Sequence, residues 1–210
     1  LLNSLVKAGI SKILFLIGYK GNLIKDRYTN LNGLKTAFSF SHENTNTGKR
    51  IINAYKMLDD NFLLIYADNY WPIQLDSMIK NLNKKNKFIS TTVFNNNDGT
   101  GEYGYDNNVQ IDQEGFVIKY DPTRKADGLN GVDIGYFVMN KKLIDNTSSE
   151  NLSFENDMLP KFIEKKNLVA FITSDQYYYI TDIKCIKKFE NFVSLKNPKP
   201  LPRSYFKNIV

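Results

Sequence analysis

Residues 46–75 read NTGKRIINAYKMLDDNFLLIYADNYWPIQL, and this stretch decides the fold. In its first half, apolar side chains recur at the spacing of one helix face: Ile51, Ala54, Tyr55 and Leu58. The apolar run from Phe62 to Tyr66 has the length of a buried strand, and it reaches a single carboxylate, Asp68, before a turn at Pro72. The stretch predicts a helix that leads into a buried strand with one acidic residue at its end.

Helices and strands alternate upstream of this stretch. Apolar residues at 1–6 predict a helix that Gly9 ends, and residues 12–18 read as a buried strand. A second helix is predicted at 22–28 and a second strand at 36–40. Alternation of this kind favours right-handed crossovers and a mainly parallel sheet.

The alternation continues downstream, with two local features. The turn signal DQEG predicts a hairpin, and the loop NNNDGTGEYG reads as a polar surface excursion. Ser153 is expected to cap a helix that Pro160 bends. The predicted elements are helices at 75–82, 153–164 and 183–193 and strands at 88–94, 108–111, 116–120, 132–139, 169–172 and 177–180.

These elements predict an α/β fold that is doubly wound, with a mainly parallel but mixed sheet. At 210 residues and 42% hydrophobic, the chain is most simply one domain, which we place at residues 1–194. The run SLKNPKPLPR indicates an extended linker, so residues 195–210 are expected to lead towards a further domain. Because Leu1 lies inside an amphipathic helix pattern, we expect the chain to be a fragment.

Composition excludes several classes of protein. The net charge of +6 comes from basic residues scattered among asparagines, so no nucleic-acid partner is expected. The single cysteine, Cys185, excludes an internal disulfide and a cysteine-based metal site and fits a reducing, cytoplasmic location. No apolar run approaches the ~20 residues that span a bilayer, so no membrane association is expected. The sequence contains no signal for oligomeric state.

Asp68 is the first candidate site residue. In an open α/β sheet, ligands bind beyond the carboxyl ends of the parallel strands, where Asp68 is predicted to lie. Mg²⁺ commonly takes only one or two protein carboxylates and completes its shell with water and substrate phosphates, so one aspartate is enough. The alternative is that Asp68 accepts backbone hydrogen bonds as a helix or turn cap.

Three stretches in the same order resemble the sugar-1-phosphate nucleotidyltransferase family over nearly the whole chain. They are LVKAGISKILFLIGYKGNLI at 5–24, the opening stretch at 46–75, where Ala67-Asp68 stands for the family's Gly-Asp, and LNGVDIGYFVMNKKLI at 129–144. The branch that the chain most resembles handles heptose or mannose 1-phosphate and is often fused to a phosphatase. The resemblance implies a Rossmann-like nucleotidyltransferase fold that lacks its first strand.

The implied reaction joins a nucleoside triphosphate, with GTP expected from the branch, to a sugar 1-phosphate and releases pyrophosphate. The sugar phosphate oxygen is already anionic and attacks the α-phosphorus in line, so no general base is required. Positioning and charge neutralisation by Mg²⁺ and by Lys or Arg groups then carry the catalysis. The only histidine, His42, argues against a histidine-based triad. In this branch the nucleotide sugar serves cell-surface polysaccharide synthesis.

The resemblance assigns site roles residue by residue. Asp68 corresponds to the first Mg²⁺ ligand and Asn69 borders the sugar site. Thr47 and Gly48 correspond to the loop that approaches the nucleoside, and the alternative for them is capping of the helix that follows, by Asn46 or Thr47.

The sugar pocket is expected to include Tyr103 and Gly104, for which a flexible-loop turn is the alternative. Asp133 stands where most members have asparagine, and it is expected to accept hydrogen bonds from sugar hydroxyls. A charged residue inside the apolar run VDIGYFV would be costly to bury in a core, which favours a functional role.

Three departures from the family pattern affect the site. The glycine-rich phosphate loop would precede Leu1, so we expect little activity from residues 1–210 alone. The family's Glu-Lys-Pro is replaced by KYDPTRK at 119–125, where Lys119, Arg124 and Lys125 are the candidates to bind the sugar phosphate, and a solvated surface position is the alternative for each. Near the end, YITDIKC places Tyr179 where the second metal aspartate is usual; Asp182, three residues later, is either a substitute metal ligand or a helix cap.

Two other functions remain open at this point. A metal-dependent glycosyltransferase shares such a sheet but normally shows Asp-x-Asp, whereas this chain has Asp68, Asn69 and Tyr70. A non-catalytic nucleotide- or sugar-binding module would fit the altered YITDIKC segment.

Overall fold

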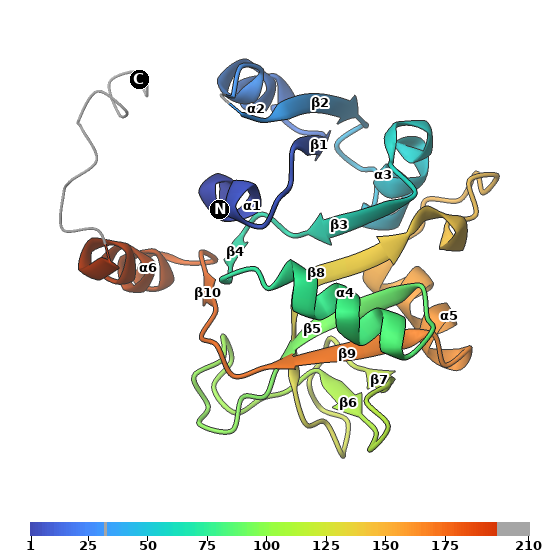
Figure 1. The fold of residues 1–210 in the computed structure, drawn as a ribbon, viewed down its shortest axis with the longest axis vertical. Helices are drawn as coiled ribbons and strands as arrows, with labels where there is room; N and C mark the ends of the chain where they lie inside the picture. Colours follow the sequence, from blue (N-terminus) through green and yellow to red (C-terminus); the bar gives the residue numbers. More distant parts are fainter. Residues whose placement is uncertain (32, 197–210) are drawn as a thin grey trace.

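The computed structural model describes residues 1–31 and 33–196 (Figure 1). Its centre is a four-stranded sheet in the order β3 (Asn61–Ile65), β8 (Val132–Asn140), β5 (Ile89–Phe94) and β9 (Leu168–Thr173). Strand β8 is antiparallel to both of its neighbours, whereas β5 and β9 are parallel. Three of these strands therefore run in one direction and β8 runs against them, which confirms the mixed, mainly parallel sheet.

Residues 12–40 form a separate parallel pair above β3 in Figure 1, made by β1 (Lys12–Ile17) and β2 (Lys35–Phe40). Helix α1 (Leu2–Lys7) precedes the pair, and α2 (Gly21–Tyr28) connects its strands. The Phe15 ring stacks on the rings of Tyr28 and Phe38, so aromatic contacts hold the connecting helix against both strands. The first strand that the resemblance places before Leu1 stays a prediction.

Strand β8 alternates between two apolar clusters because successive side chains of a strand point to opposite faces of its sheet. Ile134, Tyr136 and Val138 pack in the cluster that holds Met78 and Leu82 of α4 (Leu75–Lys84). Phe137 and Met139 pack in the other cluster, with residues of α3 (Thr47–Asn53), η3 (Phe154–Met158) and α5 (Leu159–Glu164). Asp133 and Gly135 lie on the same face of β8 as Phe137 and Met139, which is the face that η3 covers.

The boundaries of several predicted elements shift. The helix predicted through Leu58 ends at Asn53 and is followed by a 3-10 turn, η1 (Tyr55–Met57). The helix predicted from Ser153 begins as the π-helical segment η3, and the Ser153 hydroxyl accepts a hydrogen bond from the Asn156 N–H at 3.2 Å, which confirms the predicted cap.

The hairpin is confirmed as β6 (Val109–Ile111) and β7 (Val117–Tyr120). One short strand, β4 (Asn69–Tyr70), was not predicted from the sequence. It pairs antiparallel with β10 (Tyr178–Tyr179), while η2 (Lys141–Leu143) follows β8.

Helix α6 (Ile183–Lys196) takes in the first two positions of the predicted linker, and the rest of that linker, 197–210, lies outside the described residues. Within the described ranges, the model contains no helix with the length and apolar character needed to cross a bilayer.

Candidate functional site

Asp68 lies in the turn between β3 and β4, and its side chain is exposed. The turn is fixed from both sides. The Ile180 N–H donates to the Asp68 carbonyl oxygen at 3.0 Å, and the Tyr136 hydroxyl donates to the Asn69 carbonyl oxygen at 3.0 Å. Within the described ranges the Asp68 carboxylate accepts no hydrogen bond and forms no ion pair, so the capping alternative is wrong for its side chain.

The residues after Asp68 anchor this turn. The Trp71 side chain is fully buried, and the backbone N–H of Trp71 donates to the Tyr136 hydroxyl at 3.1 Å. The Tyr70 ring packs on Phe189 and Phe192 of α6. Packing of the Tyr70 ring and burial of Trp71 fix the strand end while Asp68 stays exposed, which explains the two aromatic residues after Asn69.

A cavity of about 200 Å³ opens beside Asp68. The cavity brings together Asp68, Asn69 and Asp133, which the sequence placed in two separate stretches. Four further residues line it: Tyr66, Tyr120, Gly135 and Glu155. The lining includes three carboxylates and two phenol hydroxyls, a set suited to a ligand with many hydrogen-bond donors.

Asp133 sits at an irregularity of β8, where the register against β5 shifts between Thr91 and Val93. One carboxylate oxygen, Oδ1, accepts hydrogen bonds from the Thr91 hydroxyl at 2.7 Å and the Gly135 N–H at 3.0 Å. Burial raises the pKa of Asp133 to about 6; the negative charge of Glu155 adds to the rise, and the two hydrogen bonds oppose it. The other oxygen, Oδ2, has no donor among the described residues.

Position 135 accommodates only glycine, because the backbone is left-handed there and Tyr66 packs closely against it. Its φ is +75°, and an added Cβ would lie 2.7 Å from Cδ2 of Tyr66. The Tyr66 ring therefore crosses the irregular strand closely, and its hydroxyl donates to Oε1 of Glu155. Burial and the Glu155 charge raise the pKa of Tyr66 far above its ordinary value, so the hydroxyl stays protonated and acts as a donor.

Glu155 joins this cavity to the Thr47–Gly48 loop. Its Oε2 accepts hydrogen bonds from the Thr47 hydroxyl at 2.9 Å and the Ser153 hydroxyl at 3.0 Å. The Thr47 hydroxyl in turn accepts from the Phe154 N–H at 2.9 Å. Glu155 was not predicted from the sequence as a site residue. A signal was present, because Glu155 is an acidic residue between the buried Phe154 and Met158.

Gly48 allows the loop to pack closely against η3. An added Cβ would lie 2.8 Å from the Leu152 carbonyl oxygen and 2.8 Å from the Met158 sulfur. The capping alternative for this loop is wrong, because no side chain caps α3; the Asn46 amide donates instead to the Asn151 carbonyl oxygen at 2.8 Å. Packing thus explains the glycine, and contact of this loop with a nucleoside stays a prediction.

Tyr103 and Gly104 do not line the cavity, and they lie in a loop held by several hydrogen bonds. The Asn96 amide donates to the Gly104 carbonyl oxygen at 2.9 Å, and the Glu102 N–H donates to the Tyr177 hydroxyl at 2.9 Å. These contacts speak against the flexible-loop alternative. Tyr103 itself is 55% exposed.

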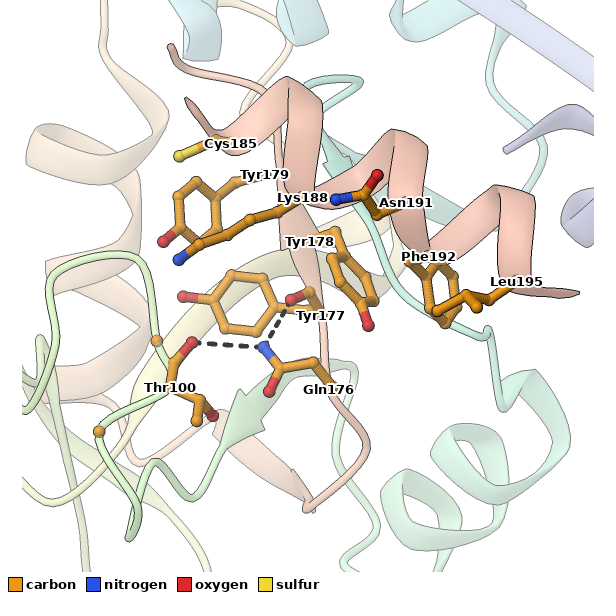
Figure 2. Close-up of a pocket in the computed structure, with 12 residues that line it drawn as sticks. Thr100, Gln176, Tyr177, Tyr178, Tyr179, Cys185, Lys188, Asn191, Phe192 and Leu195 are labelled. Atoms are coloured by element: carbon orange, nitrogen blue, oxygen red, sulfur yellow. Dashed lines mark hydrogen bonds between the residues drawn. The ribbon is translucent and has the colours of Figure 1, made fainter. Parts of the chain in front are cut away.

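A second, larger cavity of about 610 Å³ lies behind this loop, between residues 99–101, β10 and α6 (Figure 2). Figure 2 shows the Gln176 amide between the carbonyl oxygens of Thr100 and Tyr177, to which it donates at 3.3 and 2.8 Å. Tyr179, which the family resemblance places at the position of the second metal ligand, donates its hydroxyl to the Glu102 carbonyl oxygen at 3.3 Å. In this chain Tyr179 therefore holds the loop.

Asp182 caps α6, and this helix cap is one of the two roles predicted for it, the other being a metal ligand. Its Oδ1 accepts a hydrogen bond from the Cys185 N–H at 2.8 Å, and this bond lowers the pKa of Asp182. Asp182 does not line the cavity beside Asp68. No group of three or more His, Cys, Asp or Glu side chains arranged to hold a metal occurs in residues 1–31 and 33–196.

Two of the three candidate cations, Lys119 and Arg124, occupy different positions, and the third, Lys125, is exposed. Lys119 is exposed and donates to the Asp127 carbonyl oxygen at 3.2 Å; as the strand neighbour of Tyr120, it points away from the face on which Tyr120 lines the cavity. Arg124 is half-buried, and its guanidinium carbon lies 4.3 Å from the centre of the Tyr103 ring. Neither Lys119 nor Arg124 lines the cavity beside Asp68, so a contact of either with the sugar phosphate stays a prediction.

Comparison with known proteins adds a family match. The model of the family described as nucleotidyl transferase matches residues 1–183. A D-glycero-alpha-D-manno-heptose 1-phosphate guanylyltransferase from Campylobacter jejuni is 24% identical over 193 residues, which cover 90% of this chain and 80% of the relative.

Solved structures agree in fold. HddC from Yersinia pseudotuberculosis is 25% identical with a TM-score of 0.72, covering 91% of this chain and 83% of its own; the same protein has also been solved with GMP-PN. The inositol-1-phosphate CTP transferase from T. maritima, at 17% identity and a TM-score of 0.73, covers 93% of this chain and 81% of its own, and it is similar in fold.

Proposed function

The chain belongs to the nucleotidyl transferase family, and on that premise we propose that it joins a nucleoside triphosphate to a sugar 1-phosphate with release of pyrophosphate. The observation that carries the proposal is the cavity in which Asp68, Asn69 and Asp133 meet. A glycosyltransferase would not be expected to match this family over residues 1–183, so the match favours nucleotidyl transfer. The altered Tyr179 position is the one observation that favours a non-catalytic binding module.

We propose GTP as the nucleotide and a heptose or mannose 1-phosphate as the sugar substrate. Two relatives support this choice: one is a heptose 1-phosphate guanylyltransferase, and the other was solved with GMP-PN. The roles in cell-surface polysaccharide synthesis, the cytoplasmic location and the fused phosphatase stay predictions from the resemblance.

Asp68 is the residue that would hold Mg²⁺. Its carboxylate is exposed at a strand end and accepts no hydrogen bond from the described residues, and carboxylate oxygen is the ligand that Mg²⁺ prefers. The residues present therefore fit a site with one protein carboxylate. When bound, the ion would neutralise charge on the triphosphate and orient it.

The protein groups of the cavity would position the sugar. Oδ2 of Asp133 has no donor, so it can accept a sugar hydroxyl, while Glu155 and Tyr66 already bond each other and fix the wall. In the reaction an oxygen of the sugar phosphate forms a bond to the nucleotide α-phosphorus, and the bond to pyrophosphate breaks with its electron pair leaving on pyrophosphate. Because the attacking oxygen carries no proton at neutral pH, the site needs no general base.

The test uses the full-length protein incubated with Mg²⁺, one of GTP, CTP, UTP or ATP, and a panel of sugar 1-phosphates. Release of pyrophosphate that depends on both substrates is the expected result, with GTP and heptose or mannose 1-phosphate the best pair. Sugar transfer from a nucleotide sugar would indicate a glycosyltransferase instead. Binding of nucleotide or sugar without pyrophosphate release would indicate a non-catalytic module.

A further inference from the structure

We infer that Glu155 is a positioning residue, which holds the Tyr66 side of the cavity in place from the start of α3. Thr47 does not line the cavity, yet through Glu155 it sets how tightly the sugar 1-phosphate binds there. The inference rests on the proposed function and adds to it a coupling between the start of α3 and the sugar site.

Three hydroxyl groups from three segments hold the Glu155 carboxylate. Oε1 accepts a hydrogen bond from the Tyr66 hydroxyl, which follows β3. Oε2 accepts from the Thr47 hydroxyl at the start of α3 at 2.9 Å and from the Ser153 hydroxyl before η3 at 3.0 Å. Among residues 1–31 and 33–196, no Lys or Arg forms an ion pair with Glu155. Directional hydrogen bonds therefore orient this carboxylate, and no cation does.

The direction of the Thr47 hydrogen bond is fixed. The Thr47 hydroxyl accepts from the Phe154 N–H at 2.9 Å, and an ionised carboxylate can only accept. The Thr47 proton therefore points to Oε2 of Glu155, and the proton of the Tyr66 hydroxyl points to Oε1. A continuous set of hydrogen bonds runs from the backbone of η3 through Thr47 and Glu155 to the cavity wall.

The start of α3 and the segment around η3 are fixed against each other. The Lys49 N–H donates to the Leu152 carbonyl oxygen at 2.9 Å. The Asn46 N–H and the Asn46 amide donate to the side-chain and backbone oxygens of Asn151, both at 2.8 Å. Glu155 is the second residue of η3, so these contacts fix the backbone from which its side chain reaches the cavity.

The Tyr66 side chain is held at two ends. Its ring packs against Gly135, where an added Cβ would lie 2.7 Å from Cδ2 of the ring, and its hydroxyl end is held by Glu155. Tyr66 lines the cavity together with Asp68 and Asp133. Loss of an oriented Glu155 releases only the hydroxyl end, so the wall of the cavity loosens while the packing against Gly135 keeps the fold.

The experiment measures KM and kcat for the sugar 1-phosphate with the full-length protein at saturating GTP and Mg²⁺, from pyrophosphate release. The sugars are D-glycero-alpha-D-manno-heptose 1-phosphate and, in a parallel series, mannose 1-phosphate. Thr47→Val removes the hydroxyl at nearly constant size and is expected to raise this KM about fivefold to tenfold and to leave kcat within about twofold, because a loosened wall weakens binding in ground and transition states alike. Thr47→Ser keeps the hydroxyl and is expected to keep the wild-type KM.

A double variant separates this coupling from general damage. Tyr66→Phe removes the hydroxyl at the other end of Glu155. If Thr47 acts through Glu155 on Tyr66, adding Thr47→Val to Tyr66→Phe raises KM no further. A matched control is Thr147→Val, because the Thr147 hydroxyl also donates to a carboxylate, that of Asp145 at 2.6 Å, and does not line the cavity. The control is expected to keep the wild-type KM.

Each outcome has a defined meaning. An unchanged KM for the sugar 1-phosphate in Thr47→Val, a rise in KM for GTP alone, or additive rises in the double variant overturns the inference and leaves the proposed function standing. Absence of pyrophosphate release by the wild type with both sugars overturns the proposed function and the inference with it. Should Thr47→Val fail to fold, Glu155→Gln must raise KM at least about fivefold, with no further rise from Tyr66→Phe, for the inference to stand.

Discussion

Replacing Asp133 by Asn is expected to stabilise the protein at neutral pH and to leave its stability nearly unchanged at pH 4. Burial raises the pKa of this carboxyl to about 6, against an ordinary value of 3.8. A carboxyl that binds its proton more tightly in the folded chain contributes stability that is fully present below pH 3.8 and is lost as the pH rises through 6. Because one pKa unit corresponds to about 1.4 kcal/mol, the ionised form costs about 3 kcal/mol at neutral pH.

Urea unfolding of wild type and of Asp133→Asn between pH 4 and pH 8 measures this cost. The side-chain oxygen of Asn can still accept from Thr91 and Gly135, so the variant keeps the local hydrogen bonds and removes the charge. The unfolding free energy of the variant minus that of wild type is expected to rise by about 2.4 kcal/mol over this range, since part of the full effect lies below pH 4. Other titrations largely cancel in the difference.

A matched control is Asp98→Asn. Hydrogen bonds from Thr100 lower the pKa of Asp98, so its charged form is favoured in the folded chain and the corresponding difference must change with pH in the opposite direction. A difference for Asp133→Asn that stays constant from pH 4 to pH 8 would refute the reasoning, because it would mean that the carboxyl does not titrate near pH 6.

Three further predictions concern the metal, the nucleotide loop and the last helix. Asp68→Asn is expected to lower pyrophosphate release by about 100-fold to 1000-fold without unfolding the protein, and an unchanged rate would remove the Mg²⁺ assignment. Gly48→Ala is expected to lower the unfolding free energy by about 1–3 kcal/mol, because the new Cβ would lie 2.8 Å from the Leu152 carbonyl oxygen. Thermal melting measures this loss, and an unchanged Tm would show that the backbone moves apart without cost. Asp182→Ala removes the cap of α6 and is expected to cost about 0.5–2 kcal/mol of stability with turnover intact, whereas lost turnover in a folded variant would restore Asp182 as a metal ligand.

Much of the architecture could be predicted because burial leaves a local pattern. The run at 132–139 alternates between two apolar clusters, and the hairpin around DQEG follows from its turn residues. Asp68 and Asp133 could be singled out as candidate site residues from a local pattern too, since each is a charged residue attached to an apolar run. The short strand β4 was missed because its partner, β10, is more than 100 residues away.

The rest of the site depends on contacts between distant residues. Glu155 reaches Thr47 across 108 positions of the chain, and no local pattern announces that bond. The Tyr103 loop reads as flexible by composition, yet the hydroxyls of Tyr177 and Tyr179 hold it. In the same way, the contact of Arg124 with the Tyr103 ring joins residues 21 positions apart and is not announced by a local pattern.

The sequence by itself determined the alternation of helices and strands, the two acidic positions and the resemblance to a family, because hydrophobic periodicity and residue order are properties of neighbouring residues. Only the tertiary structure decided which side chains share the cavity, that Asp182 caps a helix, and that Arg124 lies beside Tyr103. These facts depend on how separate elements pack against one another, and packing is set by the whole core and not by any one stretch of chain.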